Sequence, residues 1–274
     1  MKIGFSTNAY TRKSLTYTIQ SISAIGYDGI EIVLDIPHAF LPLSEAAFQN
    51  IQKSLKKCEI KVTNLNANTV AGWYDTKTDV EKFEPSLSNE NEKLRKWRIS
   101  YSKKAIDLAS KLNASSISIT SGVCNNFHKN SLKNFQNSVE ELANYAEKRN
   151  IKLAIEYEPG LLIGKADDVF PFTKEFSNVG LNFDVCHAAV LGEKISRVIE
   201  KFGKKIFHTH ISDCKNRKHF HLIPGKGTID FEAMYSSLLK TGYSGFLTAE
   251  LYTYSSEPEK AAKETLIHLK SLVN

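Results

Sequence analysis

Four of the 8 histidines in this chain lie close together, in the stretch IFHTHISDCKNRKHFHLIPGKG at residues 206–227. His208 and His210 alternate with apolar and β-branched residues, so their side chains would share one face of a strand. Upstream, Glu156 and Glu158 alternate in the same way in IKLAIEYE. Imidazoles and carboxylates bind divalent cations and transfer protons near neutral pH. These stretches therefore predict metal binding or acid–base chemistry, provided that the fold brings them together.

The elements that must position these residues follow one repeated pattern. Short β-branched runs alternate with longer segments of helical spacing, and no change in composition marks a linker. Eight such units in 274 residues, 42% of them hydrophobic, predict a single α/β domain over residues 1–274 that folds as a closed (β/α)8 TIM barrel. An open doubly wound sheet is less favoured because no GxGxxG sequence follows the first run. The runs span residues 2–7, 29–35, 60–66, 115–121, 151–158, 179–185, 205–212 and 245–251.

Composition and charge argue against several classes of protein. No apolar stretch approaches the roughly 20 residues of a membrane span, and the first residues follow a strand pattern rather than a signal peptide, so we expect a cytoplasmic protein with no membrane partner. The 4 cysteines form no CxxC pair, which predicts reduced thiols rather than disulfides or a zinc finger. The formal net charge of +6 comes from lysines interleaved with glutamates, which is typical of a solvated surface rather than a nucleic-acid site.

Acidic residues and one histidine end four successive strand runs of the predicted barrel. They are Glu156, Asp184, His210 and Glu250. Chemistry in such barrels takes place at the C-terminal ends of the strands, so we expect these four side chains to meet there. Buried carboxylates are costly unless a cation pairs with them. Three carboxylates and one imidazole suit manganese, cobalt or magnesium at least as well as zinc, so the sequence predicts one divalent metal ion bound by these residues.

The motifs LAIEYEPG, NFDVCH, HTHISD, HLIPGKGTIDF and FLTAEL, in this order, resemble those of the xylose isomerase-like barrel superfamily. This superfamily includes sugar and sugar-phosphate isomerases and epimerases and also endonuclease IV, and the resemblance covers essentially the whole chain. It implies the same four metal ligands, Glu156, Asp184, His210 and Glu250. It also implies that His187, three positions after Asp184, contacts the substrate or binds an additional metal.

The resemblance implies an isomerase or epimerase that removes a proton next to a carbonyl group, through an enediolate stabilised by the metal. Glu156 and Glu250 match the paired glutamates of the epimerases, of which one removes the proton and the other returns it. His187 would hydrogen-bond the developing oxyanion. Glu158 departs from the family pattern, and we leave open whether it is an alternative base, a ligand for a substrate hydroxyl or an ion-pair partner. His208, deeper in the seventh strand, is expected in the core.

Several further residues are candidates for contact with a sugar or sugar phosphate. Residues 67–92 form a long loop between predicted elements, and loops of this length in compact domains often cover a binding site. We expect this loop to cover the substrate, with Trp73 stacking on a sugar ring; the alternative is a flap whose aromatic residues fill a groove. Arg217 and Lys226 are candidates for binding a phosphate. The full predicted substrate-binding set is Glu158, His221, Asn66, Trp73, Arg217 and Lys226.

Other reactions stay open at this point. A dehydratase or lyase acting on a polyol or keto acid would use the same metal and bases. An endonuclease IV-like phosphodiesterase acting on abasic DNA would need additional metals. His221 matches the loop of that enzyme, but His219 stands where the resemblance requires an Asp, and Asn66, Asn68 and Ser121 stand where it requires histidines. The predicted partner is therefore a small sugar or sugar phosphate rather than nucleic acid, and self-association into a homo-oligomer stays open.

Overall fold

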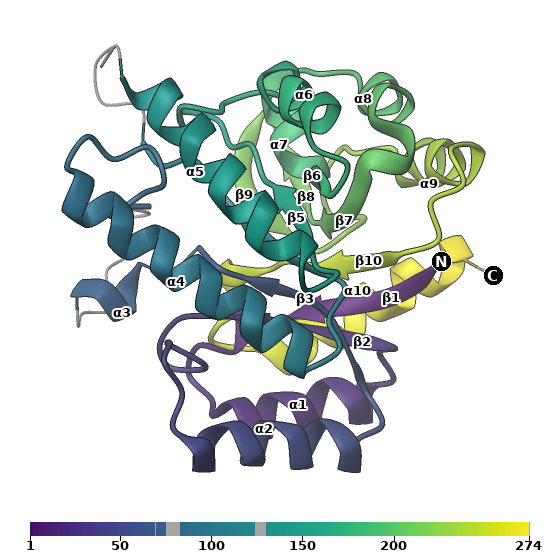
Figure 1. Cartoon of the computed structure of the whole chain (residues 1–274). Helices are drawn as coiled ribbons and strands as arrows, with labels where there is room; N and C mark the ends of the chain where they lie inside the picture. The colour runs from purple at the N-terminus through teal and green to yellow at the C-terminus, as the bar shows by residue number, and fades with distance from the viewer. Residues whose placement is uncertain (69, 75–82, 124–129, 274) are drawn as a thin grey trace.

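The computed structural model describes residues 1–68, 70–74, 83–123 and 130–273, which form a barrel of strands inside a ring of helices (Figure 1). The eight barrel strands are parallel and close in the order β1-β10-β7-β6-β5-β4-β3-β2. The predicted closed (β/α)8 barrel is confirmed. The strands are β1 (Lys2–Ser6), β2 (Gly29–Val33), β3 (Lys61–Asn66), β4 (Ser116–Ile119), β5 (Lys152–Ile155), β6 (Val179–Asp184), β7 (Ile206–Ile211) and β10 (Phe246–Ala249).

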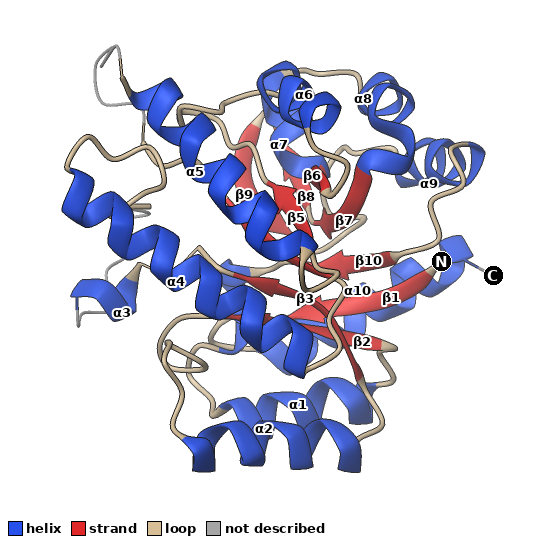
Figure 2. Cartoon of the chain, viewed as in Figure 1, coloured by secondary structure: helices blue, strands red, loops and turns tan. Residues whose placement is uncertain are grey.

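Helices surround the barrel and pack their apolar residues against the outside of the strands (Figure 2). The side chains of Ser14, Ser44 and Asp230 each accept a hydrogen bond from a backbone N–H group in the first turn of the helix that follows, α1, α2 and α9 respectively. α1 ends at Ile25 and is followed by Gly26, whose φ of 103° lies in the left-handed region that glycine adopts most readily. The helices are α1 (Leu15–Ile25), α2 (Glu45–Lys57), α3 (Ala71–Tyr74), α4 (Glu92–Lys111), α5 (Ser131–Glu147), α6 (Ala166–Glu175), α7 (Val185–Leu191), α8 (Ile195–Phe202), α9 (Phe231–Lys240) and α10 (Pro258–Val273).

An antiparallel hairpin follows β7 before the chain enters α9. Its strands, β8 (Asp213–Lys215) and β9 (Lys218–Leu222), pair with each other and lie outside the barrel sheet. Asn216 and Arg217 form the turn with φ values of 56° and 54°, the left-handed conformation that two-residue hairpin turns use. The hairpin lies next to α7, so the histidines of β9 come close to the end of β6.

Polar side chains line part of the barrel interior. Glu31 on β2 contacts Asn64 on β3, and Asn64 contacts Ser118 on β4. Glu31 also contacts His210 on β7, a strand that β1 and β10 separate from β2 in the barrel. Because side chains alternate along a strand, His208 shares the inward face with His210, as the sequence predicted.

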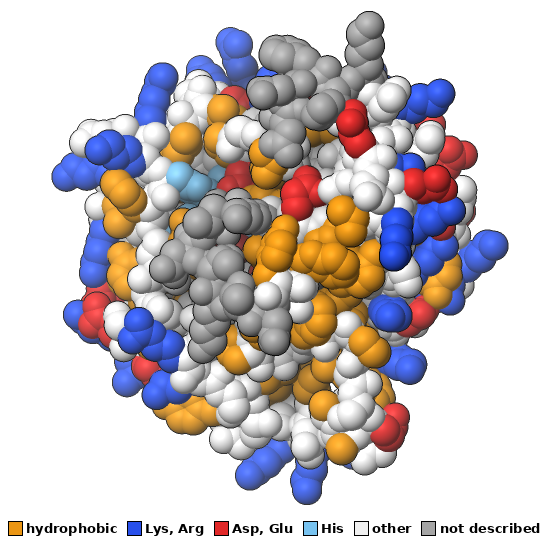
Figure 3. Space-filling view, turned by 90° about the vertical axis from the view of Figure 1, so that its left-hand side faces the viewer, with side chains coloured by type: hydrophobic (Ala, Val, Ile, Leu, Met, Phe, Trp, Pro, Cys, Tyr) orange, Lys and Arg blue, Asp and Glu red, His pale blue; other side chains and the backbone are white. Residues whose placement is uncertain are grey.

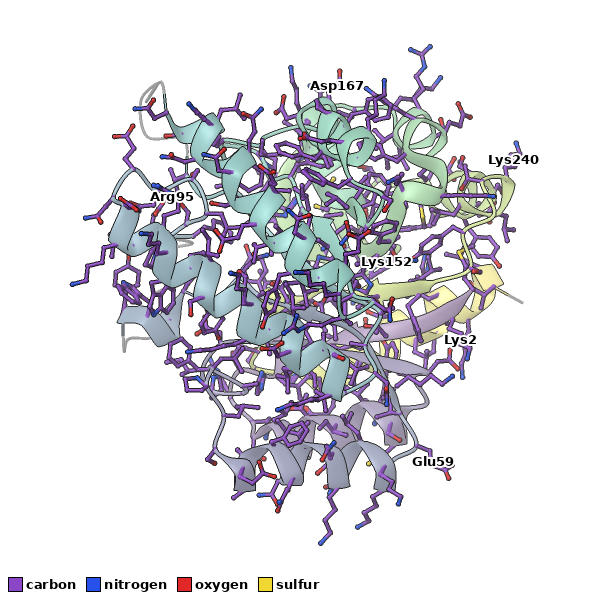
Figure 4. The ribbon with its side chains drawn as sticks, viewed as in Figure 1. Lys2, Glu59, Arg95, Lys152, Asp167 and Lys240 are labelled. Atoms are coloured by element: carbon purple, nitrogen blue, oxygen red, sulfur yellow. The ribbon has the colours of Figure 1, made fainter. Side chains whose placement is uncertain are left out.

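The C-terminal ends of the strands face the left of Figure 1, and Figure 3 looks onto this end of the molecule. A histidine and several acidic side chains reach the surface there, beside a group of hydrophobic side chains. Charged side chains elsewhere point outward from different elements, as Figure 4 shows for Glu59 after α2, Asp167 on α6 and Lys240 on α9. In the part of the chain that the structure describes, no helix combines the length and the apolar character that crossing a membrane requires.

Candidate active site

The four residues predicted as metal ligands come together at the C-terminal ends of their strands. Glu156 follows β5, Asp184 ends β6, His210 lies near the end of β7 and Glu250 follows β10. All four are buried, and each offers a ligand atom within 4.8 Å of those of the other three. The Nδ1 atom of His210 lies 2.8 Å from Oε1 of Glu156 and 3.4 Å from Oε2 of Glu250. The fold therefore gathers three carboxylates and one imidazole from four neighbouring strands, as the sequence predicted.

The Asp184 carboxylate is held at the point where β6 turns into α7. Its Oδ1 accepts hydrogen bonds from the backbone N–H groups of Cys186 at 2.6 Å and His187 at 3.1 Å. N–H groups in the first turn of a helix have no acceptor within the helix itself. Its Oδ2 is buried and has no hydrogen-bond partner among the described residues, although Nε2 of His187 lies 3.7 Å away. One oxygen is thus fixed by the backbone, and the other is left to bind a positively charged group.

The buried charges of this cluster shift the pKa values of its members. A bound cation would offset the repulsion between the carboxylates. Burial raises the pKa of Glu250 well above its usual range, and the carboxylates of Glu156 and Asp184 raise it further. Burial opposes the charged form of His210, but the surrounding carboxylates, led by Glu250, raise its pKa well above its usual range. This donor set, with an oxygen of Asp184 that accepts no hydrogen bond from the described residues, fits a divalent metal ion. That the four residues bind one stays a prediction.

Metal affinity is expected to rise with pH because His210 and Glu250 must lose protons to act as ligands. Both groups have a raised pKa in the metal-free protein, so they keep their protons at pH values where a free imidazole or carboxyl group has lost its proton. A metal ion that binds at such a pH must displace these protons. The association constant should increase by up to about tenfold per pH unit for each proton displaced, until the pH exceeds the raised pKa values. Calorimetric titration of the metal-free protein, in buffers of different protonation enthalpy, measures both the affinity and the proton release. An affinity that does not change with pH would contradict this prediction.

A second group, of three imidazoles, lies beside the first and shares Asp184 with it. Ligand atoms of Asp184, His187, His219 and His221 lie within 4.8 Å of one another. The His219 ring lies 4.5 Å from that of His187 and 4.2 Å from that of His221, measured between centroids. Burial works to raise the pKa of Asp184, but these imidazoles, led by His187, lower it to about 2. The structure thus places His219, which stands where the endonuclease resemblance requires an Asp, next to His187 and His221.

Backbone carbonyl groups set the orientation of two of these rings. His187 Nδ1 lies 2.8 Å from the carbonyl oxygen of Tyr157, and His221 Nδ1 lies 2.9 Å from that of Glu250. A carbonyl only accepts, so Nδ1 carries the hydrogen in both rings and Nε2 of the neutral ring is an acceptor. Burial lowers the pKa of His221 to about 3, which keeps this ring neutral near pH 7. When such a ring is neutral it has an acceptor atom at Nε2, whereas the expected bond from His187 to an oxyanion requires a hydrogen on that atom.

Glu31 is a residue of this region that the sequence reasoning missed. It lies on β2, is fully buried, and forms a third group of close ligand atoms with His208 and His210. Burial would raise its pKa, but the imidazoles of His210 and His208 hold the pKa well below its usual range. The signal in the sequence was a single acidic residue inside the apolar strand GIEIV, because a carboxylate in such a place is costly unless it is paired.

Trp73 lies in the short helix α3 and packs against Trp97 of α4, with ring centroids 4.3 Å apart. Together with Phe40 the two rings line a groove of about 350 Å³, and the candidate metal ligands are not among its lining residues in the described part of the chain. Packing of aromatic residues in a groove was the alternative to a substrate contact, and the choice between the two stays open. Stacking on a sugar ring stays a prediction, and residues 69 and 75–82 of the expected covering loop lie outside the described residues.

The remaining predicted substrate contacts lie at different depths. Asn66 is buried at the end of β3, and Glu158 is half-buried just after β5. Arg217 is exposed in the hairpin turn. Lys226 is exposed and forms an ion pair with Glu264 of α10, so a phosphate would have to compete with that carboxylate. Contact of these residues with a substrate stays a prediction.

A closed barrel with acid–base side chains at the C-terminal ends of its strands is the arrangement of a (β/α)8 enzyme. The chain belongs to the family described as xylose isomerase-like TIM barrel, whose model matches residues 19–272. A curated relative, fructoselysine 3-epimerase of Shigella flexneri, is 27% identical over 287 residues, which covers 100% of this chain and 98% of the relative. The chain is accordingly an enzyme of the isomerase and epimerase class.

Two solved structures share the fold over the whole chain. D-psicose 3-epimerase with D-tagatose from Clostridium cellulolyticum H10 matches with a TM-score of 0.79 and 21% identity, over 100% of this chain and 98% of that one. The IOLI protein with a binding zinc atom matches with a TM-score of 0.81 and 23% identity, also over 100% and 98%. At these identities the likeness establishes the fold.

Proposed function

We propose that this chain is a divalent-metal-dependent sugar isomerase or epimerase that moves a proton on the carbon next to a carbonyl group. The observation that carries the proposal is the meeting of Glu156 and Glu250, from β5 and β10, around Nδ1 of His210 at 2.8 and 3.4 Å. Two carboxyl groups held on separate strands can act on opposite sides of one substrate carbon, which inversion at that carbon requires. The likeness to fructoselysine 3-epimerase supports this reaction class.

Glu156, Asp184, His210 and Glu250 would hold the metal ion. When bound, a divalent cation supplies positive charge beside the carbonyl group and the enediolate that proton loss creates. The zinc atom of the IOLI structure supports a divalent ion, and the donor set also suits manganese, cobalt and magnesium.

The side chains of this chain divide the remaining tasks. One of Glu156 and Glu250 takes the proton from carbon, and the other gives a proton back on the same or the adjacent carbon. Asp184 is anchored by two backbone N–H groups, so its free oxygen keeps its place while substrate enters. His187 is held by a backbone carbonyl group, and its Nε2 would hydrogen-bond the developing oxyanion when that nitrogen carries a hydrogen.

We further propose that the substrate is a small sugar or sugar phosphate rather than nucleic acid, bound by one domain that spans residues 1–274. A cytoplasmic location stays an expectation from the sequence, and self-association stays open. The residues proposed to contact the sugar or its phosphate are Glu158, His221, Asn66, Trp73, Arg217 and Lys226.

A screen of ketoses and ketose phosphates in D2O tests the proposed function. With a divalent metal ion added, nuclear magnetic resonance should show deuterium at the carbon next to the carbonyl group, together with an epimer or aldose as product. The same incubation with a chelator should show neither. A product that has lost water would replace the proposal with a dehydratase. Cleavage of abasic DNA by protein with two or three zinc ions per chain would replace it with a phosphodiesterase.

A further inference from the structure

The imidazole of His210 is held on both sides by carboxylates from different strands. Its Nδ1 faces the cluster of proposed ligands, 2.8 Å from Oε1 of Glu156. Its Nε2 faces the barrel interior, 2.8 Å from Oε2 of Glu31 on β2. The ring and both carboxylates are buried, so water does not compete for either contact. The two ring nitrogens therefore have separate carboxylate partners, one inside the proposed metal site and one behind it. Nδ2 of Asn182 on β6 lies farther from the ring, 3.3 Å from Nδ1 and 3.5 Å from Nε2.

The Glu31 carboxylate is itself fixed by other groups in the barrel interior. Its Oε2 accepts a hydrogen bond of 2.8 Å from Nδ2 of Asn64 on β3, and Nε2 of His208 lies 3.2 Å away. Asn64 is in turn bonded to Ser116 and Ser118 of β4. A shift in register between β2 and β3, at Ile30/Glu31, pairs Glu31 with Asn64. A chain of hydrogen bonds across three strands thus sets where the carboxylate lies.

The chemistry of this contact determines which nitrogen can bind a metal. A carboxylate at the pH of most enzymes only accepts hydrogen bonds, so the ring nitrogen that faces Glu31 carries a hydrogen. By the same rule Nδ1, which faces the Glu156 carboxylate in the metal-free protein, also carries a hydrogen. Once that proton is lost, the neutral ring has its free electron pair on Nδ1. Histidines that bind metals commonly donate their second N–H to a carboxylate, which orients the ring and makes the ligand more basic.

We propose that Glu31 is a positioning residue for the metal site: it accepts the Nε2–H of His210 and thereby directs Nδ1 of that ring toward the divalent cation. This inference rests on the metal site of the proposed function. Glu31 does not contact the substrate or the ion. It acts through His210, on the strength with which the ion is held, from β2 across the barrel interior.

The test is the affinity of the metal-free protein for a divalent ion, measured without substrate. Glu31→Gln keeps the shape of the side chain and removes its charge, so the affinity for Zn²⁺ or Co²⁺ should fall by about 10- to 100-fold, as measured by competition with a coloured chelator. Asp35→Asn is the matched control, because Asp35 is also buried near the end of β2 but binds the backbone N–H groups of residues 70–72. The affinity of this control should stay within about twofold of the wild type.

A measurement on the unaltered protein keeps the inference testable if Glu31→Gln does not fold. In the Zn²⁺-loaded wild type, long-range ¹H–¹⁵N spectra of the histidine rings should show His210 with a hydrogen on Nε2 and the metal on Nδ1. Coordination through Nε2 would overturn the inference. So would a folded Glu31→Gln protein with unchanged affinity and an unchanged Co²⁺ absorption spectrum.

The outcomes separate this inference from the proposed function. A wild type that binds the ion and shows no proton exchange with any sugar, while Glu31→Gln binds the ion more weakly, overturns the function and supports the role of Glu31. A wild type that epimerises a sugar, with a Glu31→Gln variant of equal metal affinity, supports the function and overturns the role of Glu31. A wild type that binds no divalent ion overturns both.

Discussion

Replacing either Glu156 or Glu250 with Gln is expected to lower the rate of epimerisation by about 10²- to 10⁴-fold, the usual contribution of a positioned acid or base. Each substitution keeps the side chain's shape and removes its ability to take or give a proton. The rate should be measured at saturating metal concentration, because both residues are also proposed ligands. Glu141→Gln, on the exposed side of α5, is the control and should leave the rate within about twofold.

Isotope exchange gives these two variants a sharper readout than the loss of rate. If the two carboxyl groups act on opposite sides of the carbon, each variant should still exchange solvent deuterium into one epimer while failing to convert it. Glu156→Gln and Glu250→Gln should then differ in which epimer exchanges. Loss of exchange with both epimers in both variants would contradict the division of roles between the two glutamates. A rate above about one-tenth of the wild type in either variant would remove that glutamate from proton transfer.

The His210→Ala protein is expected to lose its divalent ion and its activity together. The substitution removes the nitrogen ligand and leaves three of the four proposed ligands to hold the ion. The loss of affinity should exceed the roughly 10- to 100-fold effect of changing a residue that only supports a ligand. Elemental analysis after dialysis should find about one divalent ion per wild-type chain and far less in the variant.

His268→Gln is the matched control for this measurement, because His268 lies on α10 and packs against Phe231 rather than against the cluster. This variant should keep its ion. Retention of a full equivalent by His210→Ala would contradict the predicted ligand set. Two or three ions per wild-type chain would show instead that the group of His187, His219 and His221 also binds metal.

Much of the architecture was predictable because it depends on local patterns. The alternation in IFHTHI placed His208 and His210 on the inward face of a strand, since side chains of a strand point to opposite faces in turn. The recurrence of strand and helix patterns predicted the closed barrel. In that fold all strands end at the same side, so His210 and the three strand-end carboxylates could be brought together without knowledge of the loops.

From the sequence alone, then, the strands, the closed barrel and the cluster of Glu156, Asp184, His210 and Glu250 could be determined. Only the tertiary structure decided that Glu31, 179 positions from His210 in the chain, lies next to Nε2 of the His210 ring. That contact crosses the interior and depends on the register shift between β2 and β3, and no local pattern records either feature. The positions of His219 and Trp73 were decided in the same way, by a hairpin docked on α7 and by packing against α4. Local periodicity specifies which face a side chain occupies, whereas its partner on that face depends on how distant segments pack.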